Sequence, residues 1–281
     1  MATLSLPFYI MVSLLTMPVA LSSPRCRVVA EVQGRQVVLN ENVKALLFDC
    51  DGTVAETEQT LTLAQFNLAF ASTPGLRQVR WTEREYGDLL KAGTSPARFK
   101  TYFDANPELW PLDCLFSDEK KNLFAEKMKH VKDDMFEVAM KSQGILSLRP
   151  GIAQLIDSAF ENGLGVAVCS NSNTEPVKRI CSTLLGGNRT DRIIFQCGDM
   201  QEYKSRKKPD PLMYLNACSI LGTLPSQCLV FEDSEVGLSA ATAAGMSCVV
   251  TPSYYTLGDN FDTAALVCTD LETAKLSLTS V

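Results

Sequence analysis

Short apolar runs, each followed by a turn and an amphipathic stretch, constrain the fold of this chain more than any other feature. Six such runs lie at Ala45–Phe48, Leu164–Cys169, Ile193–Cys197, Cys228–Phe231, Cys248–Val250 and Leu266–Cys268. Unbroken apolar runs are typical of parallel strands that are buried on both faces and joined by crossover helices. The sequence therefore predicts an α/β fold with a doubly wound, Rossmann-like parallel sheet.

The interval between the first run and Ile152 carries helical periodicity and no convincing strand pattern. Helices are expected at Thr57–Ala71, Thr82–Lys91, Pro96–Asp104 and Ser117–Lys141. The apolar positions expected around the last of them are Phe116, Phe124, Met128, Val131, Met135 and Val138. A helical insertion directly after the first strand lies over the carboxyl ends of the strands, where open α/β sheets bind ligands. We expect a core at 43–56 and 146–281 and a helical cap at 57–145.

The amino-terminal part of the chain resembles a targeting segment. Its first twenty-two residues are apolar and carry no charged side chain, and Pro7 and Pro18 interrupt them. This pattern favours a removable signal over a membrane span. The arginines that follow are compatible with a bipartite leader over residues 1–38 that directs the chain to a plastid. The alternative is an ordinary protein of the secretory pathway.

Composition excludes several classes of function. The formal net charge is −6, and the basic residues cluster only briefly, in Lys204–Lys208, so nucleic-acid binding by phosphate neutralisation is not expected. The ten cysteines include no C-x-x-C pair, which excludes a zinc ribbon and a thioredoxin-type redox centre. They are interpreted as small buried hydrophobes. No heptad pattern demands a partner chain, and a monomer is expected.

The most specific motif is Leu46-Leu47-Phe48-Asp49-Cys50-Asp51-Gly52-Thr53. Asp49 and Asp51 lie two residues apart at the end of an apolar strand, and Gly52 allows a sharp turn. Two crowded carboxylates repel each other and favour a bound cation, such as Mg²⁺ with its preference for oxygen ligands. Cys50 lies between them, and packing is the simpler interpretation of this thiol.

Three further polar clusters follow predicted strands or begin predicted helices. Glu232-Asp233 ends one apolar run and adds carboxylates to the same sheet edge. Ser170-Asn171-Ser172-Asn173 follows another and offers hydroxyl, amide and backbone N–H groups to an anion. Lys207-Lys208-Pro209 supplies a cation fixed before a helix. Helix capping is the alternative for Ser172, and a solvated basic face is the alternative for Lys207.

In their order along the chain and in their residues, these four clusters resemble the motifs of the haloacid dehalogenase (HAD) superfamily. The likeness runs from about Val43 to Asp270. The segments that look like its CbbY-like, sugar-bisphosphate phosphatase branch are FDCDGTVAETE, LRPGIAQLI, KKPDPLMY, FEDSEVGLSAATAAGM and SYYT. The β-phosphoglucomutases are also similar.

The resemblance implies a role for each matching residue. Asp49 is the expected nucleophile and Asp51 the expected general acid and base. Ser170 and Lys208 are expected to bind the phosphoryl oxygens. The implied metal ligands are Asp49, the Asp51 carbonyl and Asp233, with Glu232 behind it. The implied substrate-binding residues are Glu58, Arg98, Asn171 and Lys207. The implied cofactor is Mg²⁺ and the implied partner a small phosphorylated sugar.

Two departures from the branch affect the substrate rather than the chemistry. A histidine expected shortly after Glu58 is missing, and the single histidine, His130, lies in the cap. The glycine-glycine-lysine loop of the family is replaced by residues 92–98, which end in Arg98, so Arg98 or Lys100 would have to bind a second phosphate. A phosphatase for a sugar phosphate such as xylulose bisphosphate is expected. The alternatives are a phosphomutase and a non-catalytic binding regulator.

Overall fold

A six-stranded parallel sheet forms the centre of the molecule, for which a computed structural model describes residues 26–32, 35–141 and 146–280. Its strands are β3 (Ala45–Phe48), β4 (Gly165–Ser170), β5 (Ile194–Cys197), β6 (Cys228–Glu232), β7 (Ser247–Val250) and β8 (Leu266–Val267). They lie in the order β5-β4-β3-β6-β7-β8, and every neighbouring pair is parallel. The predicted doubly wound α/β sheet is confirmed.

Helices cover both faces of this sheet. Leu46 and Phe48 of β3 pack in an apolar cluster that includes α6 (Ile152–Glu161) and α7 (Thr174–Leu185). Ala45 and Leu47 pack on the other side with α9 (Leu212–Ile220) and α10 (Glu235–Ala243). Since neither face of β3 meets water, its sequence has no polar alternation. The core also contains α8 (Gly187–Thr190), η3 (Gln201–Tyr203) and η4 (Pro225–Gln227).

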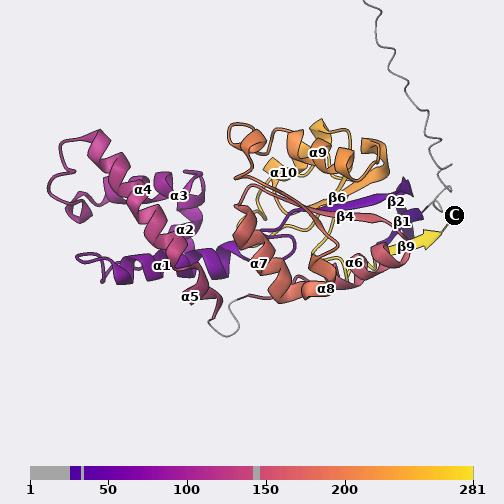
Figure 1. The fold of residues 1–281 in the computed structure, drawn as a ribbon, viewed down its shortest axis with the longest axis horizontal. Coiled ribbons are helices and arrows are strands. Elements are labelled where there is room, and N and C mark those ends of the chain that lie inside the picture. Colours follow the sequence, from indigo (N-terminus) through magenta and orange to yellow (C-terminus); the bar gives the residue numbers. More distant parts are fainter. Residues whose placement is uncertain (1–25, 33–34, 142–145, 281) are drawn as a thin grey trace, which may run out of the picture.

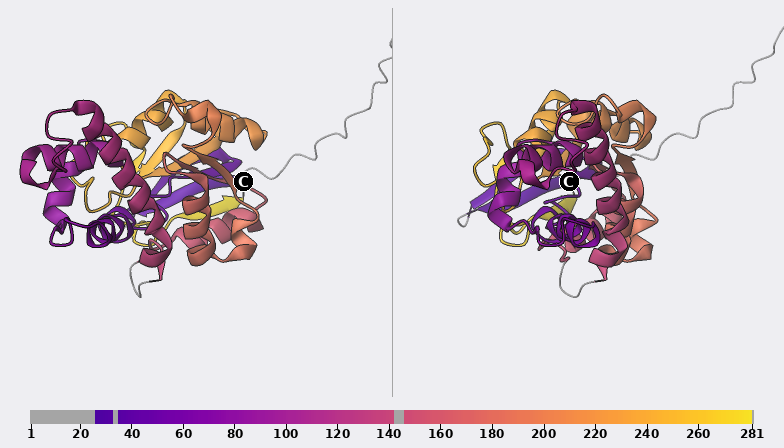
Figure 2. Two further views of the ribbon diagram at one scale, coloured as in Figure 1. Left: turned by 60° about the vertical axis from the view of Figure 1, so that its left-hand side comes forward. Right: turned by 90° about the vertical axis from the view of Figure 1, so that its left-hand side faces the viewer.

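The helices between β3 and α6 form a separate body at one end of the core (Figure 1). They are η1 (Glu58–Thr62), α1 (Leu63–Ser72), α2 (Glu83–Leu90), α3 (Ser95–Ala105), η2 (Pro107–Leu109), α4 (Asp118–Asp134) and α5 (Phe136–Met140). An aromatic cluster of their own holds them together, with Phe66, Phe70, Trp81, Phe99 and Phe103 in its centre. Viewed from this end, the cap helices lie in front of the core (Figure 2, right).

The last expected cap helix, Ser117–Lys141, is wrong as a single element. The structure interrupts it at Met135, between α4 and α5. Phe116 is 97% exposed and Val138 is 50% exposed, although both were expected on the apolar face. Phe116 precedes the first turn of α4, and Val138 belongs to the separate helix α5, so neither continues the buried side of α4.

The expected targeting segment, 1–38, extends too far into the folded chain. β1 (Cys26–Val32) and β2 (Arg35–Val43) form an antiparallel sheet with β9 (Ser277–Ser280). Figure 1 shows this small sheet at the end of the core opposite the cap. Cys26 and Val28 are fully buried in the main apolar cluster, which explains why this stretch folds with the core. The rest of the expected leader, residues 1–25, lies outside the described residues.

The cysteines agree with the composition-based expectation. All ten cysteines are free thiols, and nine are buried. Among the residues that the structure describes, no helix combines the length and apolar character needed to cross a membrane. His130 is exposed on α4 of the cap.

Candidate active site

Three neighbouring strands bring the predicted polar clusters to one edge of the sheet. In the register, Phe48 of β3 pairs with Val168 of β4 and with Phe231 of β6. The residues just beyond these positions, Asp49 and Glu232, therefore emerge side by side, and the Asp49 amide donates to the Phe231 carbonyl at 2.9 Å. Ser170 ends β4 at the same edge. Parallel register alone collects these groups from distant parts of the chain.

Lys208 lies at the centre of this edge. Its ammonium donates to Asp49 Oδ1 at 2.6 Å, to Glu232 Oε1 at 2.7 Å and to the Cys169 carbonyl at 2.7 Å. It also lies 4.8 Å from the ring centroid of Tyr214, whose hydroxyl donates to Glu232. The Lys208 side chain is only 3% exposed. A buried ammonium with all three donors engaged holds one position and fixes the carboxylates around it.

The site concentrates more negative than positive charge in a buried space. Burial, together with Glu232, Asp233 and Asp51, raises the pKa of Asp49 well above its ordinary value, against the opposing effect of Lys208. Burial and Glu232 raise the pKa of Asp233 to about 8. Burial opposes the charge of Lys208, but Asp49 and Glu232 outweigh it and hold the pKa of this ammonium above its usual value. The protonated form of Lys208 is thus stabilised, while its single positive charge does not balance the negative charge of the carboxylates.

These residues fit a divalent cation. Oxygen atoms of Asp49, Glu232 and Asp233 lie within 4.8 Å of one another, and all three residues are buried. A Cβ atom at Gly52 would lie 2.1 Å from Asp233 Oδ2, so only a glycine leaves room for this carboxylate. Carboxylate oxygens are the donors that Mg²⁺ prefers. Because Glu232 Oε1 is engaged by Lys208 and Tyr214, Asp49 and Asp233 have the freer oxygens.

The Asp51 side chain points to a different set of partners. Thr57 donates to its Oδ1 at 2.6 Å, and Ser172 and Ser170 donate to its Oδ2 at 2.7 and 3.2 Å. Its carboxylate is therefore held by hydroxyls, apart from the three clustered acids. The sequence placed Ser172 in the polar cluster after this strand, with helix capping as the alternative, and did not assign Thr57 to the site. The Ser-Asn-Ser spacing contains a signal for Ser172, because it places two hydroxyls on the same side of the strand end, whereas no motif marks Thr57.

Asn171 and Lys207 hold the loop around Lys208. The Asn171 side chain accepts from the Lys208 amide at 2.9 Å and donates to the Lys208 carbonyl at 3.3 Å. The ammonium of Lys207 is exposed and donates to the Asn171 carbonyl at 2.8 Å. These bonds join the loop after β4 to the segment that carries Lys207 and Lys208. Asn171 and Lys207 therefore help to position Lys208.

Glu58 and Arg98 meet inside the cap, where Tyr86 joins them. The fully buried Tyr86 donates its hydroxyl to Glu58, and Arg98 Nη1 lies 2.6 Å from the Tyr86 hydroxyl and 3.5 Å from Glu58 Oε2. Arg98 Nε is buried and has no hydrogen-bond partner among the described residues. Lys100 is instead paired with Asp104 at 2.5 Å. Of the two expected candidates, Arg98 lies beside Glu58 and Tyr86, whereas Lys100 is paired with an acid of its own helix.

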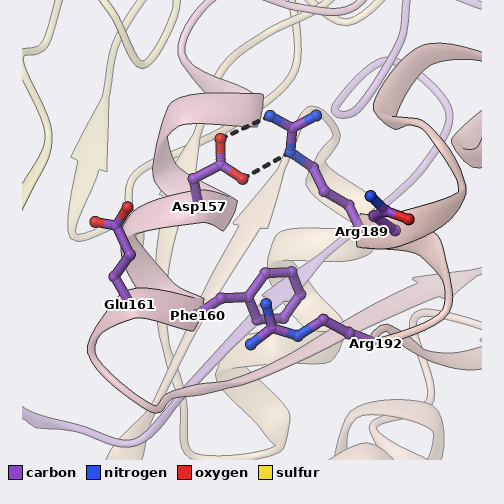
Figure 3. Close-up of a pocket in the computed structure, with 6 residues that line it drawn as sticks. Asp157, Phe160, Glu161, Arg189 and Arg192 are labelled. Atoms are coloured by element: carbon purple, nitrogen blue, oxygen red, sulfur yellow. Dashed lines mark hydrogen bonds and ion pairs between the residues drawn. The ribbon is translucent and has the colours of Figure 1, made fainter.

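A groove elsewhere on the core surface is lined by α6 and α8. Arg189 forms two bonds of 2.7 Å with Asp157, and Arg192 lies 3.7 Å from the centroid of Phe160, as Figure 3 shows. None of the expected site residues lines this groove. Its arginines already have partners, and the acids at the strand ends remain the better candidate for chemistry.

Comparison with known proteins agrees with this geometry. The family described as haloacid dehalogenase-like hydrolase matches residues 43–245. The chain belongs to this family. The matched HAD segment includes every predicted catalytic and metal-binding position. A hydrolytic enzyme is the established class of this chain.

Named relatives place the chain on the CbbY-like branch of the HAD family. It is 41% identical over 223 residues to a CBBY-like protein of Arabidopsis thaliana, which covers 79% of this chain and 67% of that protein. It is 35% identical to Protein CbbY of Rhodobacter capsulatus, over 83% of this chain and 95% of that protein. The predicted HAD-type phosphoric monoester hydrolase is thereby supported as the enzyme class.

Solved structures show the same fold. The structure of CbbY from Rhodobacter sphaeroides in complex with phosphate is 31% identical, has a TM-score of 0.65, and covers 81% of this chain and 94% of that one. A variant of the same protein, 30% identical with a TM-score of 0.65, is in complex with xylulose-(1,5)bisphosphate and has the same coverage. The predicted HAD core with a helical cap after the first core strand is confirmed as the fold class.

Proposed function

We propose that this HAD enzyme is a Mg²⁺-dependent phosphatase that hydrolyses a small sugar phosphate or bisphosphate through an aspartyl-phosphate. The observation that carries the proposal is the buried Lys208, held between Asp49 and Glu232 with Asp233 beside them. Xylulose-(1,5)bisphosphate is the first substrate to test, because a CbbY relative binds it.

In the first step, a carboxylate oxygen of Asp49 attacks phosphorus and the bond from phosphorus to the ester oxygen breaks. Asp51 gives its proton to the leaving sugar alkoxide. In the second step, water attacks the phosphorus of the aspartyl-phosphate while Asp51 takes a proton from that water. The bond from phosphorus to Asp49 then breaks and inorganic phosphate leaves.

The remaining groups bind charge and hold position. Ser170 binds the phosphoryl oxygens and the positive charge of Lys208 stabilises them, while Asn171 and Lys207 support this loop. Asp49, the Asp51 carbonyl and Asp233, with Glu232 behind them, would hold Mg²⁺, which supplies charge neutralisation for phosphoryl transfer when bound. Thr57, Ser170 and Ser172 orient the Asp51 carboxylate for its proton transfers.

The cap supplies the substrate contacts in this proposal. Glu58 at the start of η1 recognises hydroxyl groups of the sugar, and Arg98 binds a second phosphate with the donors that Tyr86 leaves free. Support for the second assignment is the position of Arg98 beside Glu58 and the pairing of Lys100 with Asp104.

The deciding experiment measures phosphate release by the purified chain from sugar mono- and bisphosphates, with Mg²⁺ and after chelation with EDTA. We expect Mg²⁺-dependent turnover that favours a ketopentose bisphosphate, and Asp49→Asn is the matched inactive control. Turnover of monophosphates alone would support the proposed reaction but contradict the proposed bisphosphate substrate. Net isomerisation without phosphate release would indicate a mutase, and binding without turnover would indicate a regulator.

We propose a plastid as the location of the enzyme, with the secretory pathway as the alternative. The support is the apolar, uncharged sequence of the first twenty-two residues and the origin of one similar relative in the plant Arabidopsis thaliana. Fusion of the leader to a fluorescent protein tests this directly. Fluorescence confined to the endoplasmic reticulum would favour the alternative.

A further inference from the structure

The loop after β7, residues 251–256, connects the clustered acids with the cap and has no part in the proposed chemistry. The Thr251 amide donates to the Glu232 carbonyl at 2.8 Å. Ser253 is buried beside Asp233, because a Cβ atom at Gly52 would lie 2.1 Å from Asp233 Oδ2 and 3.1 Å from Ser253 Cβ. The start of the loop is therefore fixed to the edge of the sheet that carries the acids.

The rest of the loop is a tight, well-bonded turn. The Ser253 amide donates to Thr256 Oγ1 at 2.9 Å, and the Thr256 amide donates to the Ser253 carbonyl at 3.2 Å. Arg149, in the second connection between cap and core, donates to the carbonyls of Thr251 and Pro252 at 3.2 Å each. Such bonding gives the tip of the loop, Tyr255, a defined position relative to the core.

Tyr255 leaves the core and contacts α2 of the cap at three places. Its hydroxyl donates to the Glu83 carbonyl at 3.1 Å. Its ring meets the Tyr86 ring edge to face, with centroids 5.7 Å apart and planes at 69°. It also lies over Gly87, where an added Cβ would be 3.0 Å from Tyr255 Cε1. One core side chain thus fits a place on α2 that a glycine keeps open.

The same helix holds the polar cluster of the cap. Tyr86 extends from α2 to Glu58 and Arg98, and its hydroxyl is bonded to both. A shift of α2 would move this hydroxyl, and with it the guanidinium of Arg98. Contacts from Asp233 through Ser253 and Tyr255 to Tyr86 therefore link the buried acids with the substrate side of the cap.

We propose that Tyr255 is a positioning residue that docks the cap on the core and thereby sets the distance between Arg98 and the strand-end acids. The inference rests on the proposed phosphatase function. Tyr255 contacts none of the reacting groups. Its effect is on discrimination between substrates. A substrate with a second anionic group must contact the core and the cap at the same time, whereas a simple phosphate ester contacts only the core.

The test compares two substrates, a ketopentose bisphosphate and p-nitrophenyl phosphate, which has one phosphate group and no sugar. For Tyr255→Phe, which removes one hydrogen bond, we expect KM for the bisphosphate to rise about 5-fold. For Tyr255→Ala, which also removes the ring contact, we expect a rise of about 10- to 50-fold. The kcat for p-nitrophenyl phosphate should change less than about 2-fold in either variant.

Two further variants separate docking from a general loss of structure. Gly87→Ala perturbs the same contact from the cap side and should raise KM for the bisphosphate as Tyr255→Phe does. Tyr254→Phe removes a neighbouring hydroxyl from a tyrosine that is 52% exposed, and it should behave as the wild type. Equal losses on both substrates in Tyr255→Phe and Tyr255→Ala would overturn the inference, and so would an effect of Tyr254→Phe as large as that of Tyr255→Phe.

Amide hydrogen exchange tests docking without any turnover. In Tyr255→Ala, faster exchange is expected in α2 and in the connections between cap and core, with β3 and β6 unchanged. Unchanged exchange in α2 would overturn the docking inference even if the enzyme is active. If the wild type hydrolyses neither substrate, the proposed function fails, and the exchange result still decides whether Tyr255 docks the cap.

Discussion

The strand-end site of the core and the polar cluster of the cap hold charged groups in different ways. In the core, Lys208, Asp49, Glu232 and Asp233 are each less than 10% exposed, and three of them follow or end strands of one sheet. Their separation is set by the backbone register of β3 and β6. Removal of Lys208 leaves the buried acids without their cation, which is costly in a low-dielectric interior.

In the cap, the charged groups are closer to water and their spacing depends on helix packing. The Glu58 side chain is 32% exposed and that of Arg98 is 13% exposed. One tyrosine hydroxyl joins them, and its own place depends on an aromatic cluster of helices. The difference suggests a division in which the sheet fixes the reaction and the cap adjusts the substrate. Four expected outcomes test it.

Asp49→Asn should have the largest effect. An amide oxygen is a poor nucleophile at phosphorus, while the side-chain volume stays the same and Lys208 keeps Glu232 as its partner. We expect kcat to fall at least about 10³-fold with the melting temperature little changed. Phosphate release and thermal denaturation are the measurements. Turnover within 10-fold of the wild type would show that Asp49 is not the nucleophile.

Lys208→Met should mainly reduce stability. Removing the ammonium leaves Asp49 and Glu232 buried without their cation, a loss of about 3–5 kcal/mol in the free energy of unfolding. Urea denaturation in EDTA measures it, and Lys207→Met is the matched control because the Lys207 side chain is exposed and should cost less than about 0.5 kcal/mol. Adding Glu232→Gln to Lys208→Met should restore part of the stability. An equal loss of unfolding free energy in Lys208→Met and Lys207→Met would contradict the difference between the buried and the exposed lysine.

The same contrast explains how much of the molecule could be predicted from its sequence. Strands buried on both faces produce apolar runs, and all six of the core strands were found by them. The acids and Lys208 could be predicted because the acids follow apolar runs and Lys208 precedes a proline, so that short sequence motifs mark them. Strand register then brings the acids together, whereas Lys208 reaches them from a loop that Asn171 holds.

Contacts between separate elements have no such signal. Thr57 reaches Asp51, and Tyr86 reaches Glu58 and Arg98, through tertiary packing that no local spacing encodes. β1 and β2 were missed because their small sheet is completed from the far end of the chain, where β9 pairs with β1. Phe116 was assigned to a buried face by its spacing, although it lies before α4 begins and is exposed.

Arg98→Met should affect binding in the cap and leave the chemistry of the core unchanged. Loss of the guanidinium removes a charge-assisted contact to a second phosphate, so KM for a ketopentose bisphosphate should rise about 10- to 100-fold. The kcat for p-nitrophenyl phosphate should stay within about 2-fold. Lys100→Met is the control, because Lys100 is paired with Asp104 on the surface of α3. A larger effect of Lys100→Met than of Arg98→Met would reverse the assignment of the second-phosphate cation.

Thr57→Val should have the smallest effect and lies where the two regions meet. Thr57 is buried immediately before η1, and its hydroxyl donates to Asp51 at 2.6 Å. Valine keeps the shape but removes the donor, so Asp51 retains only Ser170 and Ser172 and is less well oriented for proton transfer. We expect kcat to fall about 3- to 10-fold with KM unchanged, from the loss of about 1 kcal/mol of hydrogen bonding. Thr60→Val is the control, since the Thr60 hydroxyl bonds to the Glu56 carbonyl and not to Asp51. A rise in KM for the bisphosphate with kcat unchanged would assign Thr57 to the positioning of the cap instead.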